Sequence, residues 1–298
     1  MKIAYKTRFG ISYHAEVEKA LSSAKMAKYK GKFNLIFFSP PFPLNRKKKY
    51  GNLQGEEYIN WLGQIGEKLK DFLTEDGSIV IEVGNSWEPG QPEMSTLALR
   101  ALISFLDRGN YSLCQQFVWY NTAKLPSPAE WVTKKRVRVK DSFTHIWWMS
   151  KSPNPKADNS KILEEYSKNM KRLLKSKSYN SGKRPSEHSI GEKSFLKDNN
   201  GAIPSNVITA ANTASNTPYL NYCRKNNLSP HPARMPKEIP DFFIKFLTDE
   251  GDLVLDPFAG SNTTGESCEN NQRNWVSLEV NRDYIDSSIG RFEKTNIQ

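Results

Sequence analysis

Residues 39–42 form the first of two short segments whose residue types suit chemistry on a planar substrate, and they read Ser-Pro-Pro-Phe. Pro40 and Pro41 restrict the backbone and remove two N–H donors, so the carbonyl groups of this turn point in defined directions. The Ser39 hydroxyl and these carbonyls can accept hydrogen bonds from an amino group, and the Phe42 ring offers a stacking face. The segment suits a heterocycle with an exocyclic amine, although an ordinary proline-rich loop has the same composition.

The second segment, residues 256–265, reads Asp-Pro-Phe-Ala-Gly-Ser-Asn-Thr-Thr-Gly and leads into a predicted helix. Gly260 allows the backbone to approach a ligand closely, and free N–H groups at the helix start, together with Ser261 and Thr263, can bind a carboxylate. Glu279 ends the next predicted strand, where an acidic side chain can accept hydrogen bonds from two ribose hydroxyls. The alternative is an ordinary tight turn between a strand and a helix.

Apolar runs that alternate with amphipathic stretches predict the elements that carry both segments. This alternation is typical of an α/β fold with a doubly wound, mostly parallel, Rossmann-like sheet, whose ligands bind at the carboxyl ends of the strands. The expected strands cover 33–38, 78–83, 113–119, 143–149, 252–256 and 274–279, and the expected helices cover 15–30, 56–73, 95–107, 159–176, 238–251, about 263 onward and 281–294, with a turn at 75–77.

The chain of 298 residues has 43 Lys and Arg against 32 Asp and Glu, a net charge of +11. Over residues 151–200 there are 12 basic and 6 acidic residues, so this stretch holds over half of the excess. A charge of this size favours a polyanionic partner such as nucleic acid, although a basic protein without such a partner has the same composition. The stretch is either a solvated linker or a smaller lobe that faces DNA.

Together, and in this order, the two segments resemble the motifs of the amino-methylating DNA methyltransferases. The catalytic motif of that family reads Asp/Asn/Ser-Pro-Pro-Phe/Tyr/Trp, and its cofactor motif is similar to DPFAGSNTTG. The catalytic segment precedes the cofactor segment here, which is the permuted order of the beta group. Residues 73–85, 136–151 and 231–239 also resemble family segments, whereas about 152–200 match nothing. Glu16, Asn262 and Met235 stand where the family more often has other residues.

The resemblance implies S-adenosylmethionine as the cofactor and a site-specific transfer of its methyl group to DNA. Serine at position 39 resembles the first motif residue of the cytosine-N4 enzymes, whereas Asp or Asn is more usual at that position in the adenine-N6 enzymes. The sequence does not favour methylation at cytosine C5. That reaction requires a cysteine nucleophile, and no cysteine of this chain lies in a suitable loop. The implied catalytic residues are Ser39, Pro40, Pro41 and Phe42, and the implied cofactor-binding residues are Asp256, Phe258, Gly260, Ser261, Asn262, Thr263, Glu279, Pro232 and Ala233.

The implied substrate is double-stranded DNA, from which the target cytosine is flipped into the site. Basic clusters are predicted to contact phosphates, and the middle region is predicted to read the bases. The predicted domains are a catalytic half (1–150), a target-recognition region (151–205) and a cofactor half (206–298). The predicted phosphate contacts are Arg46, Lys47, Lys48, Lys49, Lys134, Lys135, Arg136 and Arg138.

The expected setting is a bacterial or archaeal cytoplasm and a restriction-modification system, in which an endonuclease shares the recognition site. No metal, disulfide framework, signal peptide or membrane segment is indicated. Three alternatives stay open on the sequence alone: adenine-N6 methylation with the same fold, methylation of RNA or a small substrate, and a DNA-binding protein without catalytic activity.

Overall fold

The computed structural model describes residues 1–42 and 53–292 and contains two compact units. The larger unit comprises Met1–Ala157 and the chain from Asn206 onward, and the smaller unit is Asp158–Ser205. The larger unit holds, in chain order, β1 (Lys2–Lys6), β2 (Gly10–His14), α1 (Val17–Leu21), α2 (Ala24–Ala27), β3 (Phe33–Phe38), α3 (Gly55–Leu69), η1 (Lys70–Phe72), β4 (Leu73–Gly84), α4 (Leu97–Gly109), β5 (Ser112–Tyr120), η2 (Glu130–Lys134), β6 (Phe143–Ser150), β9 (Val207–Thr209), α6 (Pro218–Lys225), α7 (Glu238–Leu247), β10 (Leu253–Asp256), α8 (Thr263–Asn270), β11 (Asn274–Glu279), α9 (Arg282–Ser288) and η4 (Ile289–Arg291).

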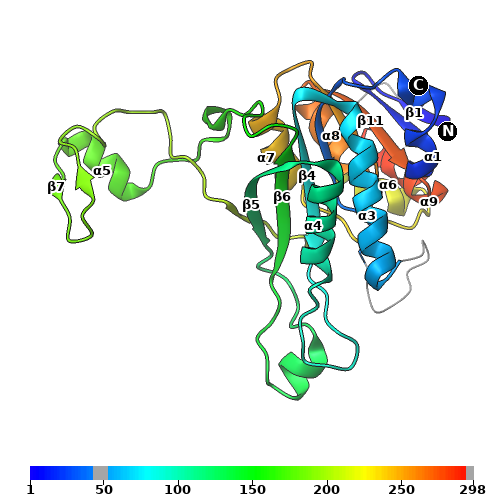
Figure 1. The fold of residues 1–298 in the computed structure, drawn as a ribbon, viewed down its shortest axis with the longest axis horizontal. Helices are drawn as coiled ribbons and strands as arrows, with labels where there is room; N and C mark the ends of the chain where they lie inside the picture. Colours follow the sequence, from blue (N-terminus) through cyan, green and yellow to red (C-terminus); the bar gives the residue numbers. More distant parts are fainter. Residues whose placement is uncertain (43–52, 293–298) are drawn as a thin grey trace. The chain divides into compact units, whose positions relative to one another are not determined.

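The strands of the larger unit form one sheet in the order β1-β2-β11-β10-β3-β4-β6-β5-β9 (Figure 1). The central strands β2, β11, β10, β3 and β4 are parallel to one another, and β6 runs antiparallel between β4 and β5. The predicted α/β class with a mostly parallel sheet is confirmed. Because β3 and β10 are neighbours, two strands that lie more than 200 residues apart in the sequence end side by side.

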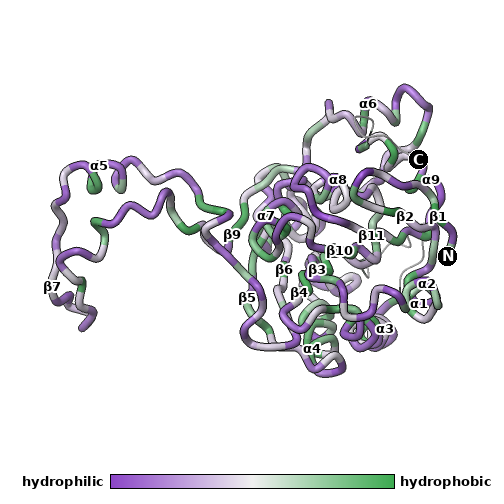
Figure 2. The backbone as a smooth tube through the Cα atoms, turned by 90° about the horizontal axis from the view of Figure 1, so that it is seen from above, coloured by the Kyte–Doolittle hydropathy of each residue, from purple (hydrophilic) through white to green (hydrophobic). Residues whose placement is uncertain are grey.

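Helices cover both faces of this sheet, with α3 and α4 on one side and α7 and α8 on the other (Figure 2). Alternate side chains of β3 point to opposite faces of the sheet. Ile36 and Phe38 pack in the core with α3 and α4, and Leu35 and Phe37 pack in the core with α7. This double burial explains why the strand is an unbroken apolar run. Trp147 and Trp148 of β6 divide between the same two cores, and both side chains are buried.

Two predicted elements of the larger unit differ from the structure, and one hairpin was not predicted. The helix expected over 15–30 is divided into α1 and α2, because Ser23 caps a new helix by accepting a hydrogen bond from Met26 N. The turn expected at 75–77 is wrong, since β4 already begins at Leu73 and the irregularity becomes a bulge against β3. The hairpin β1–β2 was not predicted, and its second strand extends the parallel sheet beside β11.

The smaller unit contains η3 (Asn159–Ile162), α5 (Lys168–Ser176) and a short hairpin of β7 (Gly182–Lys183) and β8 (Ser189–Ile190). The single helix expected over 159–176 is wrong in its first half, because Glu164 pairs with Ala202 and Ser167 caps α5 only afterwards. No side chain of α5 is buried. In the part of the chain that the structure describes, no helix of either unit is long and apolar enough to span a bilayer.

Candidate active site

The two chemical segments predicted from sequence meet at one edge of the sheet, where four neighbouring strands end. Ser39 follows β3, Asp256 ends β10 and Glu279 ends β11. Phe38 is paired with Ile81, so Ser39 lies beside Glu82 of β4. Parallel strands that end together place their following loops around one crevice, which is where α/β proteins bind ligands.

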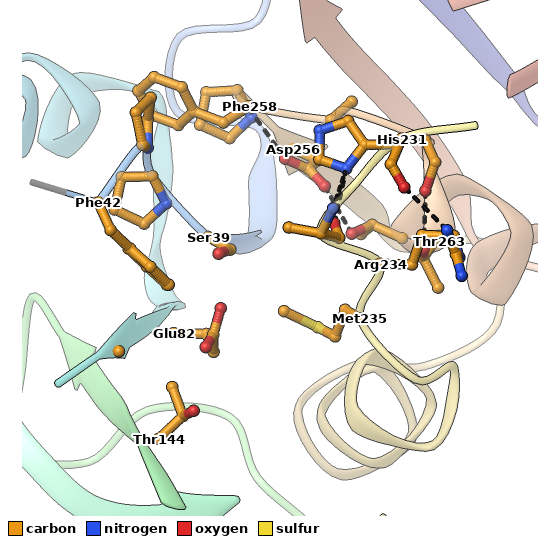
Figure 3. A pocket seen from close by; sticks show the side chains of 18 of the residues that line it. Ser39, Phe42, Glu82, Thr144, His231, Arg234, Met235, Asp256, Phe258 and Thr263 are labelled. Carbon is orange, nitrogen blue, oxygen red and sulfur yellow. Dashed lines mark hydrogen bonds between the residues drawn. The ribbon is translucent and has the colours of Figure 1, made fainter. Parts of the chain in front are cut away.

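A cavity of about 1130 Å³ opens at this edge and is lined by both segments (Figure 3). Ser39, Pro40, Pro41 and Phe42 form one part of its wall. The other part includes Asp256, Phe258, Ser261, Thr263 and Glu279, with Ala233 and Met235 from the loop before α7. The volume is large enough for a cofactor and a substrate base together.

The Phe42 ring packs against the backbone of Gly84, near the end of β4. A Cβ atom added at Gly84 would lie 3.0 Å from Phe42 Cε2, so glycine provides the room for this ring. Pro40 is buried, while Ser39, Pro41 and Phe42 are half-buried and face the cavity. The aromatic face is therefore held in position before any substrate arrives.

Glu82 is a functional candidate that the sequence interpretation missed. Its side chain is buried at 4% exposure, lines the cavity, and lies between Ser39 and Thr144 (Figure 3). Burial raises the pKa of Glu82 from 4.5 to about 7, although the hydrogen bond from Ser39 and the charge of Lys124 oppose that rise. A carboxylate within the apolar run of β4 was the available signal, because such residues are rarely buried without a purpose.

Asp256 is the second buried carboxyl group of the site, and its bonds are made within its own loop. Oδ1 accepts from Phe258 N at 3.0 Å, and Oδ2 accepts from the Thr264 hydroxyl at 2.6 Å. Burial raises the pKa of Asp256 from 3.8 to about 7, while these two bonds lower it. Asp256 therefore shapes the turn that joins β10 to α8.

Glu279 connects that turn to the end of β11. Its Oε2 accepts from Gly260 N and its Oε1 accepts from Asn281 N, each at 2.7 Å. Each carboxylate oxygen keeps a further lone pair for a ligand hydroxyl. Gly260 has φ +51°, and a Cβ atom there would lie 3.1 Å from His231 Nε2, so glycine suits both the backbone conformation and the close approach.

The remaining predicted residues of the cofactor loop separate into two groups. Ser261 and Thr263 line the cavity, and Arg291 donates to the Ser261 carbonyl and hydroxyl oxygens at 2.5 and 2.8 Å. Asn262 does not line the cavity: its side chain caps α8 and donates to Tyr5 and Ser277. The predicted cofactor contact of Asn262 thus has no support from its side chain, which serves the fold instead.

The segment before α7 closes the cofactor side of the cavity. His231 N donates to Tyr219 OH at 2.8 Å, and Arg234 Nη1 donates to the His231 carbonyl at 3.0 Å. His231, Ala233, Arg234 and Met235 line the cavity, whereas the predicted cofactor contact Pro232 is exposed outside that lining.

The predicted phosphate-binding residues lie in two places. Lys134 and Lys135 are exposed around η2 and share Glu130 as an ionic partner at 3.0 and 3.8 Å, so part of their charge is already neutralised. Arg136 is exposed beside them and has φ +56°. The first cluster, Arg46, Lys47, Lys48 and Lys49, lies outside the described residues.

The cavity fits S-adenosylmethionine by the chemistry of its wall. Two polar atoms of its lining, Tyr58 OH and Asn85 Oδ1, are buried without a hydrogen-bond partner within residues 1–42 and 53–292, and such atoms are usually satisfied by a ligand or water. The Glu279 carboxylate suits ribose hydroxyls, and the Phe258 ring offers an apolar face. In the same residues, no group of three or more His, Cys, Asp or Glu side chains is arranged to hold a metal ion.

Comparisons with known proteins agree with this geometry. A family model described as DNA methylase, covering amino-nitrogen (N6 and N4) enzymes, matches residues 33–290. The type II methyltransferase M.PvuII of Proteus hauseri is 42% identical over 99% of this chain and 87% of its own length. M.ScaI of Streptomyces caespitosus is 25% identical over 97% of this chain and 83% of its own length.

Solved structures give the same result. The PvuII DNA methyltransferase (cytosine-N4-specific) superposes with a TM-score of 0.78 and 36% identity, over 98% of this chain and 89% of that one. The complex of M1.HpyAVI with S-adenosylmethionine has a TM-score of 0.56 at 16% identity, over 95% of this chain and 98% of that one, and shares the fold alone. With its permuted motifs joined in one cavity, this chain belongs to the DNA methylase family of amino-group methyltransferases.

Proposed function

We propose that this protein transfers a methyl group from S-adenosylmethionine to N4 of a cytosine that is flipped out of duplex DNA. The observation that carries the proposal is that Ser39 and the buried carboxyl group of Glu82 lie together in the same cavity as the cofactor loop. The similarity to the cytosine-N4-specific PvuII enzyme along the whole chain supports this choice of base.

The cofactor half of the cavity binds and orients. Glu279 would hold ribose hydroxyls, and the loop around Ser261 and Thr263, with Ala233 opposite, would hold the methionine end. When bound, S-adenosylmethionine supplies an electrophilic methyl group on its sulfonium. Arg291 and Asp256 would act indirectly, by fixing the loop conformation.

The catalytic half prepares the nucleophile. Phe42 would stack on the flipped cytosine, and Ser39 Oγ and the Pro40 carbonyl would accept the two N4–H hydrogen bonds. Those bonds favour a more pyramidal nitrogen, whose lone pair is otherwise delocalised into the ring. With N4 prepared in this way, bound S-adenosylmethionine would supply the methyl carbon to it directly, without a covalent enzyme intermediate.

Glu82 gives the surplus proton a destination. After methyl transfer N4 carries a positive charge and must lose one proton. Ser39 can accept that proton from N4 while it passes its own proton to the Glu82 carboxylate, so the charges balance. A pKa raised to about 7 makes the Glu82 carboxylate a stronger proton acceptor than an ordinary glutamate, while part of it is still ionised near neutral pH.

The remaining parts of the proposal concern DNA and biological setting. Arg46, Lys47, Lys48 and Lys49, with Lys134, Lys135 and Arg136, would contact phosphates, and the unit Asp158–Ser205 would read the bases of the target site. The setting proposed is the cytoplasm of a bacterium or archaeon, where methylation protects host DNA from an endonuclease of the same specificity. The type II relatives support that setting.

The direct test is to identify the methylated nucleoside. Purified protein would be incubated with unmethylated bacterial DNA and labelled S-adenosylmethionine, and the DNA hydrolysed to nucleosides. We expect label in N4-methylcytosine, and its loss in Ser39→Ala. Ser22→Ala, which removes an exposed hydroxyl of the same type, should keep full activity. Label in N6-methyladenine would overturn the choice of base, and label in RNA alone would overturn the choice of substrate.

A further inference from the structure

The loop between β5 and β6, residues 121–142, forms one rim of the cavity. Asn121, Lys124, Ser127, Pro128 and Asp141 all line it. In Figure 1 this loop extends beyond the ends of the two strands, next to the loop that follows β4. Arg138 Nε joins the two loops by donating to the Pro92 carbonyl at 3.0 Å.

Hydrogen bonds at its base hold this rim in a defined conformation. Asn121 N donates to the Ser142 carbonyl at 2.9 Å, and Ala123 N donates to Asn121 Oδ1 at 3.0 Å. Asp141 N donates to the Ser127 carbonyl at 3.0 Å, which connects the two arms of the loop. The Asp141 carboxylate also accepts from Asn85 Nδ2 at 2.8 Å and pairs with Lys124 at 3.3 Å.

Leu125 stands out on this rim because it is 80% exposed between residues that line the cavity. A single exposed leucine is ordinary on a protein surface, but this one is presented by a fixed backbone at the mouth of the site. Pro126 follows directly and restricts the backbone conformation of Leu125 to extended forms. A second apolar side chain of the loop, Val139, is 87% exposed.

The charge around Leu125 identifies the kind of partner that it meets. Residues 121–142 contain six Lys and Arg and two acidic residues. An apolar protein surface would have to cover these cations at a desolvation cost, whereas duplex DNA pairs with them through its phosphates. Leucine is among the apolar side chains that DNA-bending proteins insert between base steps.

We propose that Leu125 is a wedge that fills the space left in the base stack when the target cytosine enters the cavity. The proposal deepens the proposed function and rests on it, because a wedge is needed only if the base is flipped. Lys124 fixes the wedge to the rim through Asp141, and the basic residues of the loop bring the rim to the phosphates. Filling the gap stabilises the flipped state against return of the base.

The test compares Leu125→Ala with wild type on two DNA duplexes. In one the target cytosine is paired with guanine; in the other it is mispaired and therefore costs less to flip out of the duplex. We expect the methylation rate on paired DNA to fall about tenfold, because flipping loses part of its compensation, and the rate on mispaired DNA to stay within about twofold. Leu125→Met should restore most of the loss, and a fluorescent base analogue beside the target should report less unstacking in Leu125→Ala.

Ile103→Ala is the matched control, because Ile103 is 56% exposed on α4 and does not line the cavity. An equal loss on both duplexes would overturn the wedge and leave Leu125 a plain contact residue. Unchanged rates on both would overturn it as well. If wild type methylates no cytosine, the proposed function fails first; if wild type is active and Leu125→Ala matches it, the wedge fails alone.

Discussion

The two sides of the cavity each contain a buried carboxyl group with a pKa of about 7, but they use it differently. On the β10–β11 side, Asp256 accepts two hydrogen bonds from its own loop. On the β3–β4 side, Glu82 faces the cavity beside Ser39, a residue of the catalytic motif. Equal pKa values therefore do not imply equal surroundings: Asp256 is bonded within its own loop, whereas Glu82 lies beside the motif that we propose to be catalytic.

The largest expected effect is that of Glu82→Gln. Glutamine keeps the size of the side chain but cannot take up a proton, so we expect kcat to fall by about 100- to 1000-fold. The dissociation constant for S-adenosylmethionine should change less than twofold, because the cofactor side is intact. Glu75→Gln, at the exposed start of the same strand, is the control. A normal kcat in Glu82→Gln would remove Glu82 from the mechanism.

The reciprocal change on the cofactor side is Glu279→Gln. The amide replaces one of two oxygens that accept from Gly260 N and Asn281 N and that are proposed to hold the ribose. We expect cofactor binding, measured by titration calorimetry, to weaken by about 10- to 100-fold, the effect of losing a hydrogen bond to a charged group. Glu250→Gln, at an exposed position, should bind normally. Unchanged affinity with a lower kcat would reverse the assignment of the two sides.

The pH dependence of the free energy of unfolding should report the raised pKa values of both carboxyl groups. Folding raises the pKa of Glu82 from 4.5 and of Asp256 from 3.8, each to about 7, so the folded state binds these protons more tightly. Their contribution to the free energy of unfolding is complete below about pH 4 and is lost as the pH rises toward 7. The difference in free energy of unfolding between Glu82→Gln and wild type should therefore shift in favour of the variant between pH 4 and pH 8. We expect a shift of about 1–3 kcal/mol, measured by urea unfolding at both pH values. No difference between the two pH values would contradict the raised pKa.

The smallest expected effect is that of Thr264→Val. This change keeps the shape of the side chain but removes the donor to Asp256 Oδ2, and should lower the free energy of unfolding by about 1–3 kcal/mol. Measured kcat with saturating cofactor should remain near wild type, since Thr264 acts on the loop. Thr133→Val, at an exposed position around η2, is the control and should leave stability unchanged. A loss of kcat without loss of stability would give the Asp256 side a chemical role.

Much of this protein is visible in local sequence patterns. The apolar run before Ser39 and the one before Pro257 predict buried parallel strands, because a strand covered on both faces needs apolar residues at every position. The helical spacing of apolar residues in α3 and α4 predicts one buried face on each helix, because residues three or four positions apart lie on the same side. The motifs that follow two of these strands, and their order, indicate the family and two segments of the cavity wall.

The sequence interpretation missed what depends on contacts between distant segments. Glu82 reads as one polar residue in a strand, and only the pairing of β3 with β4 brings it to Ser39. Asn262 reads as part of a ligand loop, yet Tyr5 and Ser277 engage its side chain inside the fold. Arg291 belongs to no motif, yet it donates a hydrogen bond to the carbonyl of Ser261, which lies 30 residues earlier in the sequence.

Sequence alone therefore determined the layers, the order of the strands' motifs and the chemistry of their loops, because these follow from burial and from the backbone properties of proline and glycine. Only the tertiary structure decided which carboxyl group lies beside the catalytic motif and which supports a loop. It also decided that Leu125 stands exposed at the rim of the cavity. The physical reason is that burial, pKa and exposure are set by neighbours in space, and sheet pairing brings those neighbours from positions more than 200 residues apart.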